Sequence, residues 1–372
     1  MATQWGSASA TTEGRAQALP NPRVTVAGRS LATSAVFNTY WVFAAKRQAV
    51  YEARLAGLPG PWTDDPILAS YRFTNCYRAA DRVSQYLIRN VSYAGDQSWR
   101  EVFFRTMLFK SFNRTSTWDL LTGRLGAVSW ADYDFARYDA VLSGAFDAGR
   151  RLYSPAYVVP PPAFGEKRKH SNHLRLIEHM MVSGAPEKLQ ACTTMRGAFE
   201  LLRSYPAVGD FLAYQYLIDL NYSAGLGFDE MEFVVPGPGA RDGIRKCFGP
   251  GANGIESEVI RYMAETQSGH FARLGLDFGG LRGRPLQLID CQNLFCEVDK
   301  YARVAHPEIS GISGRSRIKQ SYRLDPAALD AWFPPKWRIN TQPSEAARTG
   351  RGARGLSNSR SSVMVVASTG SA

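Results

Sequence analysis

Two short turns rich in proline and glycine, separated by one apolar run, place the tightest limit on how this chain can fold. Residues 201–239 contain an apolar run, the turn PAVG at 206–209, a second apolar run and the turn PGPG at 236–239. This pattern predicts two helices joined by a tight corner, with the second helix starting at Asp210 or Phe211. We expect Gly209 to take the positive φ that such a corner demands.

The start of that second helix is a candidate site for an anion. Its free N–H groups and its dipole would face outward, and a phosphate suits both. Helix–turn–helix corners of this kind are typical of proteins that bind a DNA backbone. They also serve as plain packing corners, and the residues alone leave both interpretations open. The candidate phosphate-binding positions are Gly209, Gly237, Gly239 and Arg241.

The charge and composition of the chain narrow its class. Over 372 residues the formal net charge is +11, so the surface favours polyanions. Hydrophobic and aromatic fractions of 45% and 12% are typical of a globular protein. Residues 1–34 and 341–372 are poor in apolar side chains, which predicts disordered tails, the second of them basic. Between them, residues 35–340 predict one all-α body, a helical bundle.

Several classes of protein are disfavoured. No apolar run approaches the roughly 20 residues of a membrane span, so no membrane contact is expected. The five cysteines include no C-x-x-C pair, which argues against a disulfide framework or a zinc ribbon. His170, His173 and His179 lack ligand-spaced partners, so no metal site is expected. Because no secretion signal begins the chain, we expect it to be intracellular, in cytoplasm or nucleus, with a transit peptide left open.

A predicted helix over residues 72–91 carries a polar stripe. Five side chains follow one another at spacings of three and four, which places them on one face. They are Asn75, Arg78, Arg82, Gln85 and Arg89. The planar fork of arginine matches an oxyanion, which favours phosphate recognition slightly over a plain solvated face.

A second stripe lies on a predicted helix over residues 286–303. Opposite an apolar face it presents two acids, an amide and a lysine: Asp290, Asn293, Glu297 and Lys300. This set fits either a catalytic constellation or an outward, salt-bridged surface.

Capping signals predict where other helices begin. A long helix is expected over residues 34–56, and Asp65 is expected to cap a short helix that Pro66 begins. Ser98 with Glu101 predicts a capping box for a helix through residue 112. In the same way, Ser129 with Asp132 predicts a capping box for the helix that follows.

Four segments together resemble the helical domain of 5-hydroxymethyluracil DNA kinases. They are residues 39–57, 61–88, the corner at 206–209 with 234–248, and 286–303, and the most specific block contains Trp62, Asp64, Asp65, Asn75 and Arg78. This domain is shared with the alpha-glutamyl/putrescinyl-thymine pyrophosphorylase group of thymine hypermodification. The similarity covers about residues 35–340. It implies a helical body akin to the helix-hairpin-helix DNA glycosylases, acting on DNA that carries modified thymine.

The chain departs from the relatives in two ways. Kinases of that family add a phosphate-binding domain, but this sequence has no G-x-x-x-x-G-K-[ST], so P-loop phosphotransfer is not expected. No cofactor is identifiable, and a nucleotide or amine co-substrate stays open. A glycosylase of this fold is expected to have an aspartate in the region that corresponds to residues 234–239. This sequence has no carboxylate there. Asp229, Glu230 or Glu232 are the candidate substitutes.

The resemblance implies roles for the two stripes. On an extruded base, Arg78 and Arg82 would bind the DNA backbone or a phosphorylated 5-hydroxymethyl group. Asp290 or Glu297 would act as general base, with Lys300 offsetting charge on the leaving group. The expected partner is DNA with modified thymine, and a separate kinase stays open. A base-modifying transferase competes with a non-catalytic reader of modified pyrimidines and with a base-excision glycosylase.

Overall fold

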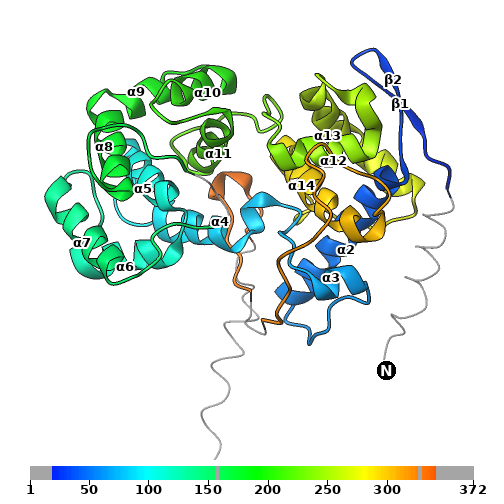
Figure 1. Cartoon of the computed structure of the whole chain (residues 1–372), viewed down its shortest axis with the longest axis horizontal. Helices are drawn as coiled ribbons and strands as arrows, with labels where there is room; N and C mark the ends of the chain where they lie inside the picture. The colour runs from blue at the N-terminus through cyan, green and yellow to red at the C-terminus, as the bar shows by residue number, and fades with distance from the viewer. Residues whose placement is uncertain (1–18, 156–158, 326–328, 341–372) are drawn as a thin grey trace, which may run out of the picture.

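A computed structural model of the chain describes residues 19–155, 159–325 and 329–340, and in them two helical lobes lie side by side (Figure 1). The first lobe holds α5 (Trp99–Phe112), α6 (Thr115–Leu125), α7 (Phe135–Asp147), α8 (Lys169–Val182), α9 (Ala185–Gln190), α10 (Met195–Arg203) and α11 (Asp210–Asn221). The second holds β1 (Arg23–Val26), β2 (Arg29–Ala32), α2 (Ala35–Leu55), α3 (Pro66–Ser70), α12 (Pro238–Phe248), η3 (Gly249–Ala252), α13 (Glu256–Arg273) and α14 (Leu288–Ala305).

Two short segments lie where the lobes meet (Figure 1). One is the irregular helical run η1 (Arg78–Ala80), α4 (Arg82–Leu87) and the π-helical turn η2 (Ile88–Ser92). The other is residues 329–340 with the 3₁₀ turn η4 (Pro335–Trp337), which return to the junction from the end of the described chain. Both lobes therefore contribute to this junction.

Helix α14 is the centre of the second lobe. It packs against α12, α2 and α13, and its apolar face is buried. The crossing with α12 is close, because a Cβ on Gly243 would lie 2.1 Å from the carbonyl oxygen of Phe295. In the first lobe, α5 has the corresponding central place, with α6, α8, α9 and α11 against it.

The expectation of a disordered tail through residue 34 was wrong for residues 23–32. They form an antiparallel hairpin that pairs Arg23 with Ala32 and Val26 with Arg29. Its inward side chains reach the core, and Val26 is 4% exposed. Burial of this apolar face stabilises the hairpin against the second lobe. The remaining parts of the two predicted tails, 1–18 and 341–372, lie outside the described residues.

The capping role expected of Asp65 was correct. Asp65 caps α3, where its Oδ1 accepts from the backbone N–H groups of Ile67 and Leu68, and Ser34 caps α2. Helix α11 begins at Asp210 as expected. In the part of the chain that the structure describes, no helix has the length and apolar character needed to cross a membrane.

Two predicted capping pairs were wrong. The Ser98 side chain does not cap α5, and Glu101 instead accepts from the backbone N–H groups of the 130–131 turn. Ser129 and Asp132 bond to each other in a turn ahead of α7, which Asp134 caps. In both cases a nearby turn binds the side chain more fully than the helix end would.

The single helix expected over residues 72–91 was also wrong. Three carboxylates accept hydrogen bonds from backbone N–H groups that a helix would use. Glu297 accepts from the N–H of Thr74, Asp81 from the N–H of Asn75, and Asp290 from the N–H of Arg78. Residues 72–77 are therefore a loop, and the five polar side chains do not share one face. Because Asn75 lies before the helical segments, the stripe predicted from spacing does not exist.

The corner between α10 and α11 is tight, but its conformation differs from the expectation. Gly209 has φ −79°, and the positive φ of 60° belongs to Ala207. Gly209 is exposed, as the anion-site hypothesis requires. At the second turn, Gly237 is buried against the ring of Phe211, and a Cβ on Gly239 would lie 3.0 Å from the Cys296 Sγ. These two glycines permit close packing.

Candidate functional site

Charged side chains from both lobes meet inside the junction. We name six of them the junction cluster: Arg78, Lys110, Asp219, Glu230, Arg284 and Asp290. Arg78 comes from η1, Lys110 from α5, Asp219 from α11 and Asp290 from α14. Glu230 and Arg284 lie in the connections that precede α12 and α14. Groups of this kind are seldom buried unless they are paired.

Arg78 is bound on all sides of its guanidinium. It is 4% exposed and forms a forked pair with Asp219, Nη1–Oδ1 at 2.6 Å and Nη2–Oδ2 at 2.8 Å. Its Nε donates to Gln215, and its Cζ lies 5.7 Å from the ring centre of Tyr222. A phosphate could reach Arg78 by displacing Asp219, so the predicted phosphate contact stays a prediction with that condition attached.

Asp219 is held ionised by two cations. The Lys110 ammonium lies 2.9 Å from Asp219 Oδ2, an oxygen that also accepts from Arg78 Nη2. Burial raises the pKa of Asp219, but Arg78 and Lys110 outweigh it and hold the pKa below its ordinary value. The two cations therefore satisfy a carboxylate that the fold has removed from water.

Asp290 ties η1 to the start of α14. Its Oδ2 accepts from the Gln287 backbone N–H at 3.0 Å in a capping box, and its Oδ1 accepts from that of Arg78 at 2.9 Å. Burial raises the pKa of Asp290 to about 7. The structure thus brings Asp290 and Arg78 together, through the backbone of Arg78. A carboxyl with this pKa is suited to exchange a proton near neutral pH.

Glu230 and Arg284 form the outer part of the junction cluster. Arg284 Nη2 donates to Glu230 Oε1 at 2.8 Å, and Glu230 is 7% exposed. Burial raises the pKa of Glu230, although Arg284 and Lys336 oppose it. The Trp337 ring covers the Arg284 guanidinium, with the Cζ 4.1 Å from the ring centre. Residues from the end of the described chain therefore complete this part of the site.

The other candidates on α14 hold a loop in place. Glu297 accepts from the Thr74 backbone N–H at 3.0 Å and pairs with Lys300 at 2.6 Å. The Lys300 ammonium lies 4.6 Å from the ring centre of Phe73. Asn293 is half-buried on the same helix. Their proposed catalytic roles stay predictions, and the observed contacts of Glu297 and Lys300 are with the loop over residues 72–77.

The most specific residues of the family block also have structural contacts. Asp65 Oδ2 accepts from Lys46 at 3.1 Å and from the Tyr301 hydroxyl at 2.7 Å. Trp62 donates to the Leu58 carbonyl and lies beneath the Arg54 guanidinium. Two further members differ in exposure: Asp64 is exposed, and Asn75 is half-buried, accepting from Arg47 and donating to Ala80.

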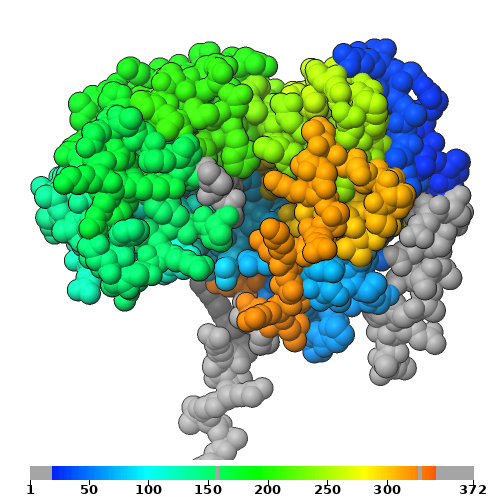
Figure 2. Space-filling view, in the orientation of Figure 1, coloured from blue at the N-terminus to red at the C-terminus, as the bar shows by residue number. Residues whose placement is uncertain are grey.

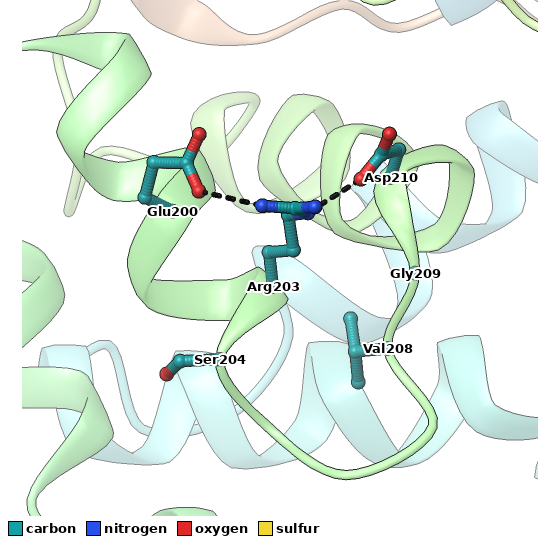
Figure 3. Close-up of a pocket in the computed structure, with 6 residues that line it drawn as sticks. All are labelled: Glu200, Arg203, Ser204, Val208, Gly209 and Asp210. Carbon is teal, nitrogen blue, oxygen red and sulfur yellow. Dashed lines mark hydrogen bonds and ion pairs between the residues drawn. The ribbon is translucent and has the colours of Figure 1, made fainter.

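The turn at Gly209 opens onto an exposed hollow of about 420 Å³ (Figure 3). Arg203 bridges two carboxylates there, at 3.2 Å from Glu200 and 2.5 Å from Asp210. The side chains around the hollow therefore carry one more negative than positive charge, which opposes a phosphate even though the start of α11 favours one. The remaining exposed candidates are Arg82, at the start of α4, and Arg241, which pairs with Glu256.

Histidines do not gather into a metal centre. Among the described residues, no group of three or more His, Cys, Asp or Glu side chains is arranged to hold a metal ion. His170 contacts Ser143, whereas His173 contacts the Tyr153 hydroxyl and the Pro160 carbonyl.

A basic segment follows α14 along the surface. Residues 312–323 contain four exposed cations and no acidic residue: Arg315, Arg317, Lys319 and Arg323. Backbone bonds from Tyr322 to Ser70 and from Arg72 to Gln320 attach the segment to the end of α3. Figure 2 shows this orange segment beside a recess between the lobes. We refer to residues 312–323 as the basic segment.

Sequence reasoning missed Lys110, Asp219 and Arg284. Lys110 and Asp219 are each the single charged residue of a largely apolar stretch, MLFKSF and FLAYQYLIDL. A lone charge in such a run must be buried with a partner, so this signal was present. No comparable signal marked Arg284, because the loop that carries it has no periodicity.

A family model described as the helical domain of 5-hmdU DNA kinase matches residues 34–311, which include the α-helices of both lobes and the junction cluster. The chain belongs to this family. It is similar to the 5-hmdU DNA kinase of Bacillus phage SP10, with 26% identity over 286 residues that make up 72% of this chain. The chain spans about 45% of the length of that relative. No solved structure matches this 5-hmdU DNA kinase helical domain.

Proposed function

We propose that this chain binds DNA carrying 5-hydroxymethyluracil and takes part in the modification of that base. Membership of the 5-hmdU DNA kinase helical-domain family supports this substrate class. The observation that carries the DNA contact is the basic segment, which has four exposed cations and lies beside the recess between the lobes (Figure 2). A helix pair at the Gly209 corner would then belong to a helix-hairpin-helix arrangement, as in the related glycosylases.

The spacing of the basic segment suits a backbone contact. Arg315, Arg317 and Lys319 alternate along the chain, and in an extended conformation alternate residues would be about 6.6 Å apart and point the same way. No carboxylate within residues 312–323 neutralises them. Contacts of this kind release counterions from DNA and make binding depend on salt.

The junction cluster is the candidate site for the base. It lies between the lobes, and its carboxyls Asp290 and Glu230 both have a raised pKa. Perturbed carboxyls at such a junction are typical of functional sites. A pyrimidine drawn out of the duplex would meet hydrogen-bonding groups there instead of water.

A triple substitution tests the DNA contact. Arg315→Gln, Arg317→Gln and Lys319→Gln together should weaken duplex binding and lower the slope of log K against log salt by about 3, near 0.9 per lost phosphate contact. The matched control neutralises Arg124, Arg137 and Arg150, which are exposed on the first lobe. If both triple variants lose the same affinity, the DNA contact does not lie on the basic segment.

The reaction is assigned by incubating the protein with duplexes that contain thymine or 5-hydroxymethyluracil and analysing the nucleosides by mass spectrometry. A new nucleoside mass would indicate a transferase. An abasic site would indicate excision by a glycosylase. Tight retention of the 5-hydroxymethyluracil duplex without chemical change would indicate a reader that presents the base to another enzyme.

A further inference from the structure

Residues 329–340 fold back over the outer part of the junction cluster. Their backbone is bound from both sides: Gln85 accepts from the Trp332 N–H, and Arg282 donates to the Ile339 carbonyl. Lys336 reaches the carbonyls of Asn221, at the end of α11, and Leu226. We call residues 329–340 the plug. Figure 1 shows it at the centre of the molecule between the lobes.

One indole ring of the plug makes the contacts that a planar ligand would make. Trp337 lies over the Arg284 guanidinium, with the Cζ 4.1 Å from the ring centre, and meets Tyr222 edge-on at 5.6 Å and 87°. Trp337 also favours the ionised form of the Glu230 carboxyl, which places the N–H edge of the ring toward that acid. A flat ring is thus stacked on a cation while its polar edge faces a buried acid.

We infer that Trp337 occupies a binding site for an extruded pyrimidine base, and that DNA binding displaces the plug from it. The inference rests on the proposed function and names the part of the junction that takes the base. A pyrimidine of the thymine type has a flat face for Arg284 and a ring N–H for Glu230, as the indole has. Aromatic and guanidinium stacking is how many proteins hold a splayed base.

The plug is held by buried and by surface groups. Phe333 is 0% exposed, whereas the ion pair of Arg89 with Asp330 lies at the surface, where the Asp330 side chain is 83% exposed. Such pairs contribute little to stability in water. By contrast, the inner pairs of the junction cluster, Arg78 and Lys110 with Asp219, are formed without the plug. Release would therefore uncover Glu230, Arg284 and Tyr222 while both lobes keep their structure.

The plug also lies outside the residues that the family model matches, which end short of the 35–340 expected from the resemblance. The family match ends at residue 311, whereas Glu230, Arg284 and Tyr222 fall within it. The groups around the indole belong to the common domain, and the ring that fills the space between them belongs to a segment beyond it. We expect this arrangement if the plug is an internal ligand that competes with the extruded base for a site of the common domain.

Binding of a short single-stranded oligonucleotide containing one 5-hydroxymethyluracil tests the inference in the full chain. Trp337→Ala should bind it about tenfold more tightly than wild type, the gain expected when a site open in about one molecule in ten becomes open in all. Trp337→Phe, which keeps a ring but loses the N–H donor, should gain less. Adding Glu230→Ala to Trp337→Ala should remove the gain.

If Trp337 served only to pack the junction, the Trp337→Ala variant should bind the oligonucleotide more weakly than wild type. Equal or weaker binding by Trp337→Ala than by wild type overturns the inference and leaves the proposed function standing. If neither protein binds the oligonucleotide, the proposed function fails as well. Thermal melting of each variant establishes that it is folded under the conditions of the assay.

Trypsin provides a second readout on wild type, without any substitution. Lys336 and Arg338 lie on the plug, and the oligonucleotide should speed cleavage after both, because displacement frees the backbone that Gln85 and Arg282 hold and lets the protease bind it. An unmodified oligonucleotide without thymine is the control and should leave the rate unchanged. Slower or unchanged cleavage with the 5-hydroxymethyluracil probe would contradict displacement.

Discussion

Asp219 on α11 receives the guanidinium of Arg78 through two parallel contacts of 2.6 and 2.8 Å, while both side chains are almost completely buried. The backbone N–H of the same arginine is bound by Asp290 of the other lobe. Arg78 therefore connects the two lobes, through its guanidinium to Asp219 and through its backbone N–H to Asp290.

Removing the charge of Asp219 should damage the fold. Asp219→Asn leaves Arg78 and Lys110 buried without an anion, and breaking a buried pair from one side costs about 3–5 kcal/mol. Urea denaturation should show a loss of this size. The control is Asp210→Asn, whose pair with Arg203 lies at the surface and should change stability little. Similar losses in both variants would contradict the internal role of Asp219.

The raised pKa of Asp290 predicts a pH-dependent stability. The folded-state pKa is about 7, and the unfolded value is about 3.9. Between these values the folded protein keeps a proton that the unfolded chain has lost, so the contribution of Asp290 to stability falls as pH rises, by about 1.4 kcal/mol per pH unit. Asp290→Asn should remove this fall.

Denaturation of both proteins at about pH 5 and about pH 7.5 measures this difference. The stability of wild type relative to Asp290→Asn should be greatest at the lower pH. Asp81, whose pKa burial also raises to about 7, is present in both proteins and cancels from the comparison. A difference that does not vary with pH would show that Asp290 is ionised throughout.

The close crossing of α12 and α14 should not tolerate a methyl group. Gly243→Ala would place a Cβ 2.1 Å from the Phe295 carbonyl oxygen, and overpacking of this kind costs about 1–3 kcal/mol or more. Gly269→Ala is the matched control, because Gly269 lies on an exposed face of α13, where an added Cβ would meet no atom within 4 Å. There, alanine should stabilise the helix by about 0.5–1 kcal/mol. Thermal melting distinguishes the two.

Local signals in the sequence predicted the helices well where packing and capping agree. The bounds of α2 and α14, within two residues, and the start of α11 follow from apolar periodicity, and the start of α3 follows from the capping residue Asp65. Prediction failed over residues 72–91 because Glu297, Asp81 and Asp290 bind backbone N–H groups there, and two of these side chains come from α14. No local pattern encodes contacts over that separation.

The site was predictable in part. Arg78 and Asp290 were selected on separate helical stripes, and the structure brings them into contact, although through a backbone group. The expected stripe around Arg78 was wrong, because its guanidinium turns inward to Asp219. Glu230 was noted as a displaced carboxylate, but its partners Arg284 and Trp337 come from loops whose positions depend on the finished fold.

Photocrosslinking tests the central claim, that DNA carrying the modified base lies along the basic segment and across the recess. A duplex with one photoreactive thymine analogue beside 5-hydroxymethyluracil is irradiated with the protein, and the attached peptides are identified by mass spectrometry. The account predicts attachment within residues 312–323 and at the junction cluster or the plug. Attachment confined to α6 and α7, on the far side of the first lobe, would contradict it.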